Sequence, residues 1–242
     1  METCQSNLAR RRALSLLLMA LIHLVQSMTY PGTNTLLPPE ERSLGTIYRL
    51  LASTSVNELD ARFRALPPGH PALPRGEYQL SQHVEKRCVY TFCMCPGGQV
   101  VASASEKGRV VTNGMSYHAR SGKNANAAVV VSVGGEDFGG DPRRAIAFQR
   151  ELEAKAYAAG RSAGEYAAPA ENIQSFLEGR GQLSIGRVQP TYDRGVRAAD
   201  LGALLPTELA DTLRAGLRAY ERKIAGYTAP EAILTGLETR TS

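Results

Sequence analysis

The 242-residue sequence contains no tryptophan, whereas 23 of its residues are glycine. A chain without the largest aromatic side chain and with so many glycines is expected to have a loop-rich body. Its 43% hydrophobic and 21% charged residues argue against wholesale disorder and allow one large or two small globular domains.

The sequence also lacks a clustered run of basic residues in its body. The formal charge is +5, but residues 1–12 hold three arginines against one glutamate, which leaves 25 basic and 22 acidic residues elsewhere. A nucleic-acid-binding face needs basic side chains gathered on one surface, and here they are interspersed with acidic ones. We therefore expect no nucleic-acid partner.

The apolar run at the start of the chain is short for a membrane span. Ala13–Val25 follows three arginines and has thirteen residues, whereas a spanning helix needs about 20. The run fits a secretory signal peptide cleaved near Ser27, and the protein would then be exported. Cleavage would leave three cysteines, an odd number for a secreted protein. We favour a chance apolar stretch or plain helix in a cytoplasmic protein, with membrane association only if residues 13–25 are a genuine signal or anchor.

The cysteines lack the spacing of the common metal and redox sites. A zinc site needs a second cysteine pair or histidines, and Cys88, His83 and His118 do not supply such a unit, so we expect no metal. Cys93 and Cys95 have one residue between them, whereas the thioredoxin-type motif has two. In a regular strand these two thiols point to one face, either as buried packing or as candidate catalytic groups.

Glycine and asparagine are concentrated around these cysteines. Pro96, Gly97 and Gly98 predict a sharp turn after the strand, where backbone N–H groups can approach a ligand. Asn113 followed by Gly114 is a hairpin signal. Asn124 and Asn126 precede the apolar run Ala127–Val133, which is typical of a buried strand, and their amides either anchor a loop or bind a cofactor edge.

The order of apolar runs and turn signals predicts an α/β or α+β fold. A small, mainly antiparallel sheet from about Tyr90 to Val133 is expected to pack against three helices. The helices are predicted over residues 142–159, 169–178 and 206–225. Upstream, the expected units are a leader and proline-rich linker at 1–39, and a helical segment with a proline-rich boundary at 40–74. The main domain is then 75–242, and residues 1–74 are expected to be dispensable for its fold.

Several motifs resemble one protein family. The succession TFCMCPGG, VTNGMSYHAR, GKNANAAVVVSV and EDFGGD is similar to the middle of bacterial proteins known as uncharacterised FAD-dependent dehydrogenases. The similarity continues through FQRELEAKAYAAGRSAGEYAAPAENIQSFLEGR to the final LTGLETRTS and covers about residues 75–242. In that family this region is inserted between two parts of the FAD-binding domain. The family's glycine fingerprint for the dinucleotide is missing, since only Gly32, Gly45 and Gly69 precede Arg75.

The resemblance implies flavin-dependent oxidoreduction, with FAD as the cofactor and this chain as a partial enzyme that supplies the substrate or cap region. The alternative is an inactive truncated product or a non-enzymatic interaction domain. The resemblance gives no general acid or base, leaves Cys93 and Cys95 as catalytic candidates, and leaves the small-molecule substrate unknown. Tyr117 and His118 are further polar groups near the turn. The cofactor-binding residues implied are Pro96, Gly97, Gly98, Asn113, Gly114, Asn124, Asn126 and Arg240.

Overall fold

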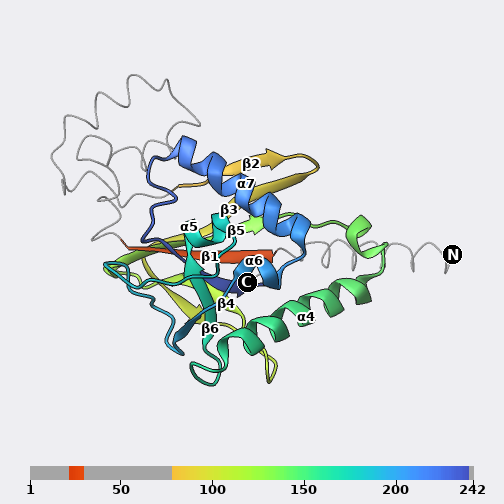
Figure 1. Cartoon of the computed structure of the whole chain (residues 1–242), viewed down its shortest axis with the longest axis horizontal. Helices are drawn as coiled ribbons and strands as arrows, with labels where there is room; N and C mark the ends of the chain where they lie inside the picture. Colours follow the sequence, from red (N-terminus) through yellow and green to blue (C-terminus); the bar gives the residue numbers. More distant parts are fainter. Residues whose placement is uncertain (1–21, 30–77, 240–242) are drawn as a thin grey trace.

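A central mixed sheet carries the fold in the computed structural model, which describes residues 22–29 and 78–239 (Figure 1). The strand order is β2-β3-β5-β1-β8-β6-β7, and β4 pairs with β3 away from this path. The strands are β1 (Ile22–Thr29), β2 (Ser81–Val84), β3 (Arg87–Ala102), β4 (Thr112–Ser116), β5 (Asn124–Val131), β6 (Ala168–Asn172), β7 (Val196–Ala198) and β8 (Ile233–Glu238). All pairs are antiparallel except β6 with β7. The predicted fold class is confirmed.

The long strand β3 organises one half of the sheet. Its first part pairs with β5, from Val89 opposite Val131 to Phe92 opposite Ala128, and its last part pairs with β4. Every residue of β5 is buried, as the apolar run predicted. A strand buried on both faces needs cover on both, and this placement explains the apolar residues 127–131 of the strand.

The other half of the sheet lies outside the range that the sequence indicated. Strand β6 (Ala168–Asn172) is followed directly by the short helix α5 (Ile173–Glu178), where one helix over 169–178 was predicted. Strand β8 lies beyond the last predicted helix and outside the predicted range of the sheet. These segments are short and contain proline or glycine, so their strand conformation comes from pairing with neighbours and not from local preference.

Strand β1 connects the two halves. It pairs with β5 along its whole length and with β8 on its other side. Residues 22–25, which the sequence assigned to a leader or plain helix, are therefore part of a strand inside the sheet. The remaining predictions upstream of Tyr78, namely residues 13–21, the linker at 31–39, the helices within 40–66 and the boundary at 67–75, lie outside the described residues.

Two longer helices flank the sheet in Figure 1. Helix α4 (Pro142–Gly160) begins as predicted, with Asp141 as its cap and the Asp141 side chain accepting a hydrogen bond from the Arg143 N–H at 2.9 Å. Helix α7 (Thr207–Lys223) buries one apolar face that includes Leu213 and Leu217. The short elements among the described residues are the 3₁₀ helix η1 (Gly135–Phe138), α5 and α6 (Leu201–Leu204).

Helix α7 approaches the sheet closely at one glycine. A side-chain carbon added at Gly216 would lie 2.6 Å from Val89 of β3, so only glycine allows this approach. The core beneath it includes Leu217, Tyr220 and Phe176, which are fully buried. No helix in the described part of the chain is long and apolar enough to cross a membrane.

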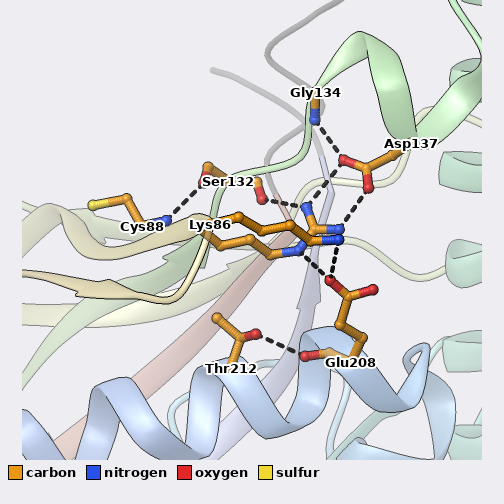
Figure 2. Close-up of polar contacts among 8 residues, drawn as sticks. Lys86, Cys88, Ser132, Gly134, Asp137, Glu208 and Thr212 are labelled. Atoms are coloured by element: carbon orange, nitrogen blue, oxygen red, sulfur yellow. Dashed lines mark hydrogen bonds and ion pairs between the residues drawn. The ribbon is translucent and has the colours of Figure 1, made fainter.

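A buried arginine ties β3 to two helical elements (Figure 2). The Arg87 guanidinium donates to both carboxylate oxygens of Asp137 in η1, at 2.5 and 3.0 Å, and to the Ser132 carbonyl oxygen at 3.0 Å. Its Nε donates to Glu208 of α7 at 3.1 Å. The Asp137 carboxylate also accepts from the Gly134 N–H at 2.7 Å. A bidentate pair of this kind fixes orientation as well as charge, so Arg87 holds the end of the sheet against η1 and α7.

Candidate functional site

The cysteine segment lies in an irregular part of β3. Cys93 has a left-handed backbone conformation, with φ of +49°, and the register against β5 shifts on both sides of Cys95. This irregularity cancels the strict alternation of side chains, because a bulge turns successive residues to new directions. The prediction that both thiols share one face is therefore wrong: Cys93 is exposed, whereas Cys95 is only 8% exposed.

The buried thiol has a distinct electrostatic setting. Its Sγ donates a hydrogen bond to the Cys93 carbonyl oxygen at 3.1 Å. Burial raises the pKa of Cys95 to about 11, with a smaller contribution from the neighbouring Cys93 thiol. At neutral pH the Cys95 side chain is thus protonated and unreactive by itself, since the thiolate is the nucleophile.

Residues 96–98 do not form the predicted sharp turn, because they lie within β3 and Gly98 pairs with both β4 and β5. Close packing accounts for the two glycines of this segment. Gly97 has φ of +57°, and a side-chain carbon there would lie 2.0 Å from the Arg120 carbonyl oxygen. The Gly97 carbonyl oxygen accepts a hydrogen bond from the Gly122 N–H at 3.0 Å, and the Pro96 carbonyl oxygen accepts one from Ser116 Oγ. A side-chain carbon at Gly98 would lie 2.5 Å from the Met115 carbonyl oxygen. These contacts join this part of β3 to the neighbouring segments, and a ligand is not needed to explain them.

Asn113 and Gly114 do not form the predicted hairpin turn. They lie within β4, opposite Val101 and Val100 of β3, and neither has a positive φ. The strand pairing with β3 overrides the local turn preference of the Asn-Gly pair. The Asn113 Oδ1 is buried and has no hydrogen-bond partner.

The two asparagines of β5 have different surroundings. Asn124 Nδ2 donates to the Gln189 carbonyl oxygen at 2.8 Å, so its amide anchors the loop that follows residue 188. Asn126 is 1% exposed and lies opposite Cys95 on β3, but neither its Nδ2 nor its Oδ1 has a hydrogen-bond partner. The Asn126 Oδ1 lies 2.1 Å from the position of a side-chain carbon at Gly114. An orphaned buried amide costs about 1–3 kcal/mol, so Asn126 is a residue that stability alone does not explain.

The structure thus gathers most of the predicted residues at one corner of the sheet. Cys95 lies opposite Asn126 and Gly98 opposite Asn124, while Gly114 of β4 contacts Asn126. The loop residue Thr191 joins them, because its Oγ1 accepts a hydrogen bond from the Val100 N–H at 2.8 Å. We call Cys93, Cys95, Asn113, Gly114 and Asn126 the β3–β5 corner.

Other predicted groups lie at the edge of this corner or outside the described residues. The Tyr117 side chain is 69% exposed and lies within hydrogen-bond distance of Gln99, and His118 is exposed. Arg240 falls outside the described residues. Within residues 22–29 and 78–239, no group of three or more His, Cys, Asp or Glu side chains has the arrangement of a metal site.

Sequence reasoning missed a buried carboxyl group in β6. Glu171 is fully buried, and its Oε1 accepts a hydrogen bond from the Leu201 N–H at 2.7 Å while Oε2 has no partner. Burial raises the pKa of Glu171 to about 7, and the Leu201 hydrogen bond partly opposes that rise. The only sequence signal was a glutamate between apolar residues in a segment that was interpreted as the start of a helix.

A cavity of about 550 Å³ opens beside α4, away from the β3–β5 corner. Its lining includes Arg109, Arg143 and Arg150, with Ile146 and Ala147. Glu106 already pairs with two of these arginines, Arg109 and Arg150. The cavity shares no residue with the predicted site.

Residues 57–241 match the family model described as FAD-dependent protein, C-terminal domain-like. An uncharacterised protein of Clostridium beijerinckii is 47% identical over 176 residues, which make up 72% of this chain and 33% of the relative. The chain therefore spans about a third of the length of the curated relative it matches.

Proposed function

The chain belongs to the family of FAD-dependent proteins with this C-terminal domain, and on that premise we propose that it forms the substrate-side part of a flavin-dependent oxidoreductase. In this proposal the β3–β5 corner faces the polar edge of a flavin ring. The Asn126 and Asn113 amides hydrogen-bond to that edge, and the two cysteines lie beside it. The substrate is a small molecule that contacts the same corner.

The observation that carries the proposal is the orphaned amide of Asn126. Its donor and its acceptor are both unpartnered at 1% exposure, which is rare because buried polar groups are nearly always hydrogen-bonded. The edge of a flavin ring presents carbonyl oxygens beside an imide N–H, and a carboxamide complements such a pair with one donor and one acceptor. The nearby buried thiol of Cys95 and the buried Oδ1 of Asn113 extend the same polar cluster.

The described residues do not fit a whole FAD molecule. A dinucleotide pyrophosphate is normally held at a free helix N-terminus after a glycine turn. Helix α4 follows Gly139 and Gly140, but the Asp141 carboxylate already caps it and would repel a phosphate. The space between Gly114 and Asn126 is also filled. We therefore derive no reaction step through the cofactor and propose that other residues of a FAD-containing family member hold the dinucleotide.

The proposal is tested first by the stability of two matched variants. Asn126→Leu removes an unsatisfied amide and keeps similar volume, so we expect the free energy of unfolding to rise by about 1 kcal/mol. Asn124→Leu breaks the hydrogen bond to Gln189 and should lower it by about 1–2 kcal/mol. Urea denaturation of the purified chain measures both. If Asn126→Leu is as destabilising as Asn124→Leu, the amide is structural and the proposal loses its main support.

The second test uses the longer relative from Clostridium beijerinckii. Leucine at the position of the relative that aligns with Asn126 is expected to weaken flavin retention during gel filtration, followed by flavin absorbance. The aligned change for Asn124 is the control for general damage. Unchanged flavin binding and reduction in the first variant would contradict the placement of this corner against the ring.

A non-enzymatic interaction domain is the second candidate function. It is favoured by the exposed side chains of Met115 and Tyr117, which are 51% and 69% exposed near the same corner. If neither flavin retention nor flavin reduction responds to the corner in the relative, this function is the better account.

A further inference from the structure

The two cysteines of the β3–β5 corner form an asymmetric pair. Cys93 is exposed and can meet a molecule from solution, whereas Cys95 is buried. Redox-active dithiols need one thiol of each kind, because the accessible thiol attacks an external disulfide and the second thiol then attacks the resulting mixed disulfide. The high pKa of Cys95 keeps it protonated in the meantime.

The local backbone brings the two side chains within reach of each other. In a regular strand, residues two apart have Cα atoms about 6.6 Å apart, close to the upper limit of about 6.8 Å for a disulfide. Here the left-handed Cys93 and the register shift replace the regular strand. The Cys95 Sγ folds back onto the Cys93 carbonyl oxygen, 3.1 Å away, so it already lies against the residue that carries the other thiol. The Cys93 thiol is near enough to raise the pKa of Cys95.

From this geometry we propose that Cys93 and Cys95 form a thiol–disulfide exchange site that reduces external disulfides and closes into an intrachain disulfide. Met94, between them, is half-buried within β3, and the register shift between Phe92 and Cys95 bends the strand at this point. The proposal rests on the cysteines and the backbone alone and does not require a flavin.

The reaction balances in two exchange steps. Cys93 loses its thiol proton, and its thiolate attacks one sulfur of a disulfide RSSR, which forms a mixed disulfide and releases one RS⁻ that becomes RSH. Cys95 then loses its proton, and its thiolate attacks the Cys93 sulfur and releases the second RSH. The pair of cysteines is oxidised by two electrons, and RSSR is reduced to two RSH.

The test uses the full chain carrying Cys4→Ser and Cys88→Ser, so that only the proposed pair remains. Cys88 is a suitable thiol to remove because it is half-buried and its Sγ makes a long hydrogen bond, 3.7 Å, to the Val89 carbonyl oxygen. The protein is equilibrated without oxygen in mixtures of reduced and oxidised glutathione, quenched with acid and alkylated. Intact mass and peptide mapping then report the state of both thiols. We expect the loss of two hydrogen atoms, with the link inside one peptide between Cys93 and Cys95.

Single replacements in the same background identify the two roles. Cys95→Ser should stop at the mixed disulfide and gain one glutathionyl group on Cys93. In Cys93→Ser, Cys95 should react with oxidised glutathione at least about tenfold more slowly than Cys93 does in Cys95→Ser, because a buried protonated thiol is a poor nucleophile. Circular dichroism checks that each variant is folded.

The results that overturn the proposal are equally definite. Absence of the Cys93–Cys95 link at every glutathione ratio would refute it, and so would a glutathionyl group that appears first on Cys95. Because no flavin is present in this experiment, its failure would leave the proposed flavin function untouched. Conversely, a disulfide that forms here would stand even if the longer relative showed no role for the corner in flavin reduction.

Discussion

Replacing Arg87 by methionine should destabilise the domain strongly. The Arg87 side chain is 8% exposed and pairs with Asp137, which is 20% exposed. Removing one partner of a buried pair costs about 3–5 kcal/mol, and the partial exposure of Asp137 places the cost near the lower end, at about 3 kcal/mol. For a domain of this size a loss of that magnitude lowers the melting temperature by roughly 6–12 °C.

A neighbouring lysine offers the matched control. Lys86 pairs with Glu208 at 3.1 Å, but the two side chains are 71% and 54% exposed. Exposed pairs contribute about 0–1 kcal/mol, so Lys86→Met should melt close to the wild type. Differential scanning calorimetry compares the two variants. A melting temperature for Arg87→Met within a degree or two of Lys86→Met would refute the reasoning that burial makes the Arg87 network important.

The pH dependence of the same variant adds a second check. The hydrogen bond from Arg87 lowers the pKa of Asp137 below its ordinary value. A carboxyl group with a lowered pKa contributes stability above its unfolded pKa, and that stability is lost as pH falls through the folded pKa. The difference between wild type and Arg87→Met should therefore be full at pH 6 and shrink below about pH 4.

Two further predictions concern single buried positions. The pKa of Glu171 is raised to about 7, so its contribution to stability is full below the unfolded pKa and is lost as pH rises through about 7. Glu171→Gln should remove this loss, which is on the order of 3 kcal/mol. Urea denaturation at pH 5 and pH 8 measures it, and an equal fall in the free energy of unfolding in variant and wild type would contradict the prediction. Gly97→Ala should cost about 3 kcal/mol or more, because a side-chain carbon there meets the Arg120 carbonyl oxygen at 2.0 Å. Gly108 has a similar φ, +70°, but a side-chain carbon there would have no atom within 4 Å, so Gly108→Ala should cost only about 1–2 kcal/mol. Equal melting temperatures for the two variants would show that crowding at Gly97 is unimportant.

Helices α4 and α7 and strand β5 could be predicted because each carries its own signal. Asp141 and the following proline start α4, leucines at spacings of four define α7, and an apolar run gives β5. Strands β6 and β8 could not be predicted, since Pro169 and Gly236 disfavour a strand and only pairing with neighbours selects it. Strand β1 contains neither proline nor glycine; its first residues belong to the apolar run 13–25, which does not distinguish helix from strand, and pairing with β5 and β8 selects the strand.

The candidate site was partly readable from the sequence. Its residue types and approximate position followed from the Cys-Met-Cys-Pro-Gly-Gly segment and the asparagines. The different environments of Asn124 and Asn126 could not be predicted, because the environment of Asn124 depends on its hydrogen bond to the Gln189 carbonyl oxygen, 65 residues away. Likewise Cys93 and Cys95 differ in burial through a bulge, and the alternation rule for regular strands cannot foresee one.

The position of β1 between β5 and β8 has a consequence for how the sheet is assembled. Val25 pairs with Thr235, so two strands near opposite ends of the chain must meet before the sheet is continuous. Such pairing raises the contact order, and the entropy cost of closing a long loop comes before the stabilising contacts between the strands form. During synthesis, β1 and β5 are available long before β8 leaves the ribosome, so the edge of β1 that pairs with β8 stays unpaired until β8 has been made. Slow folding and a need for protection against edge-to-edge association follow from that order of events.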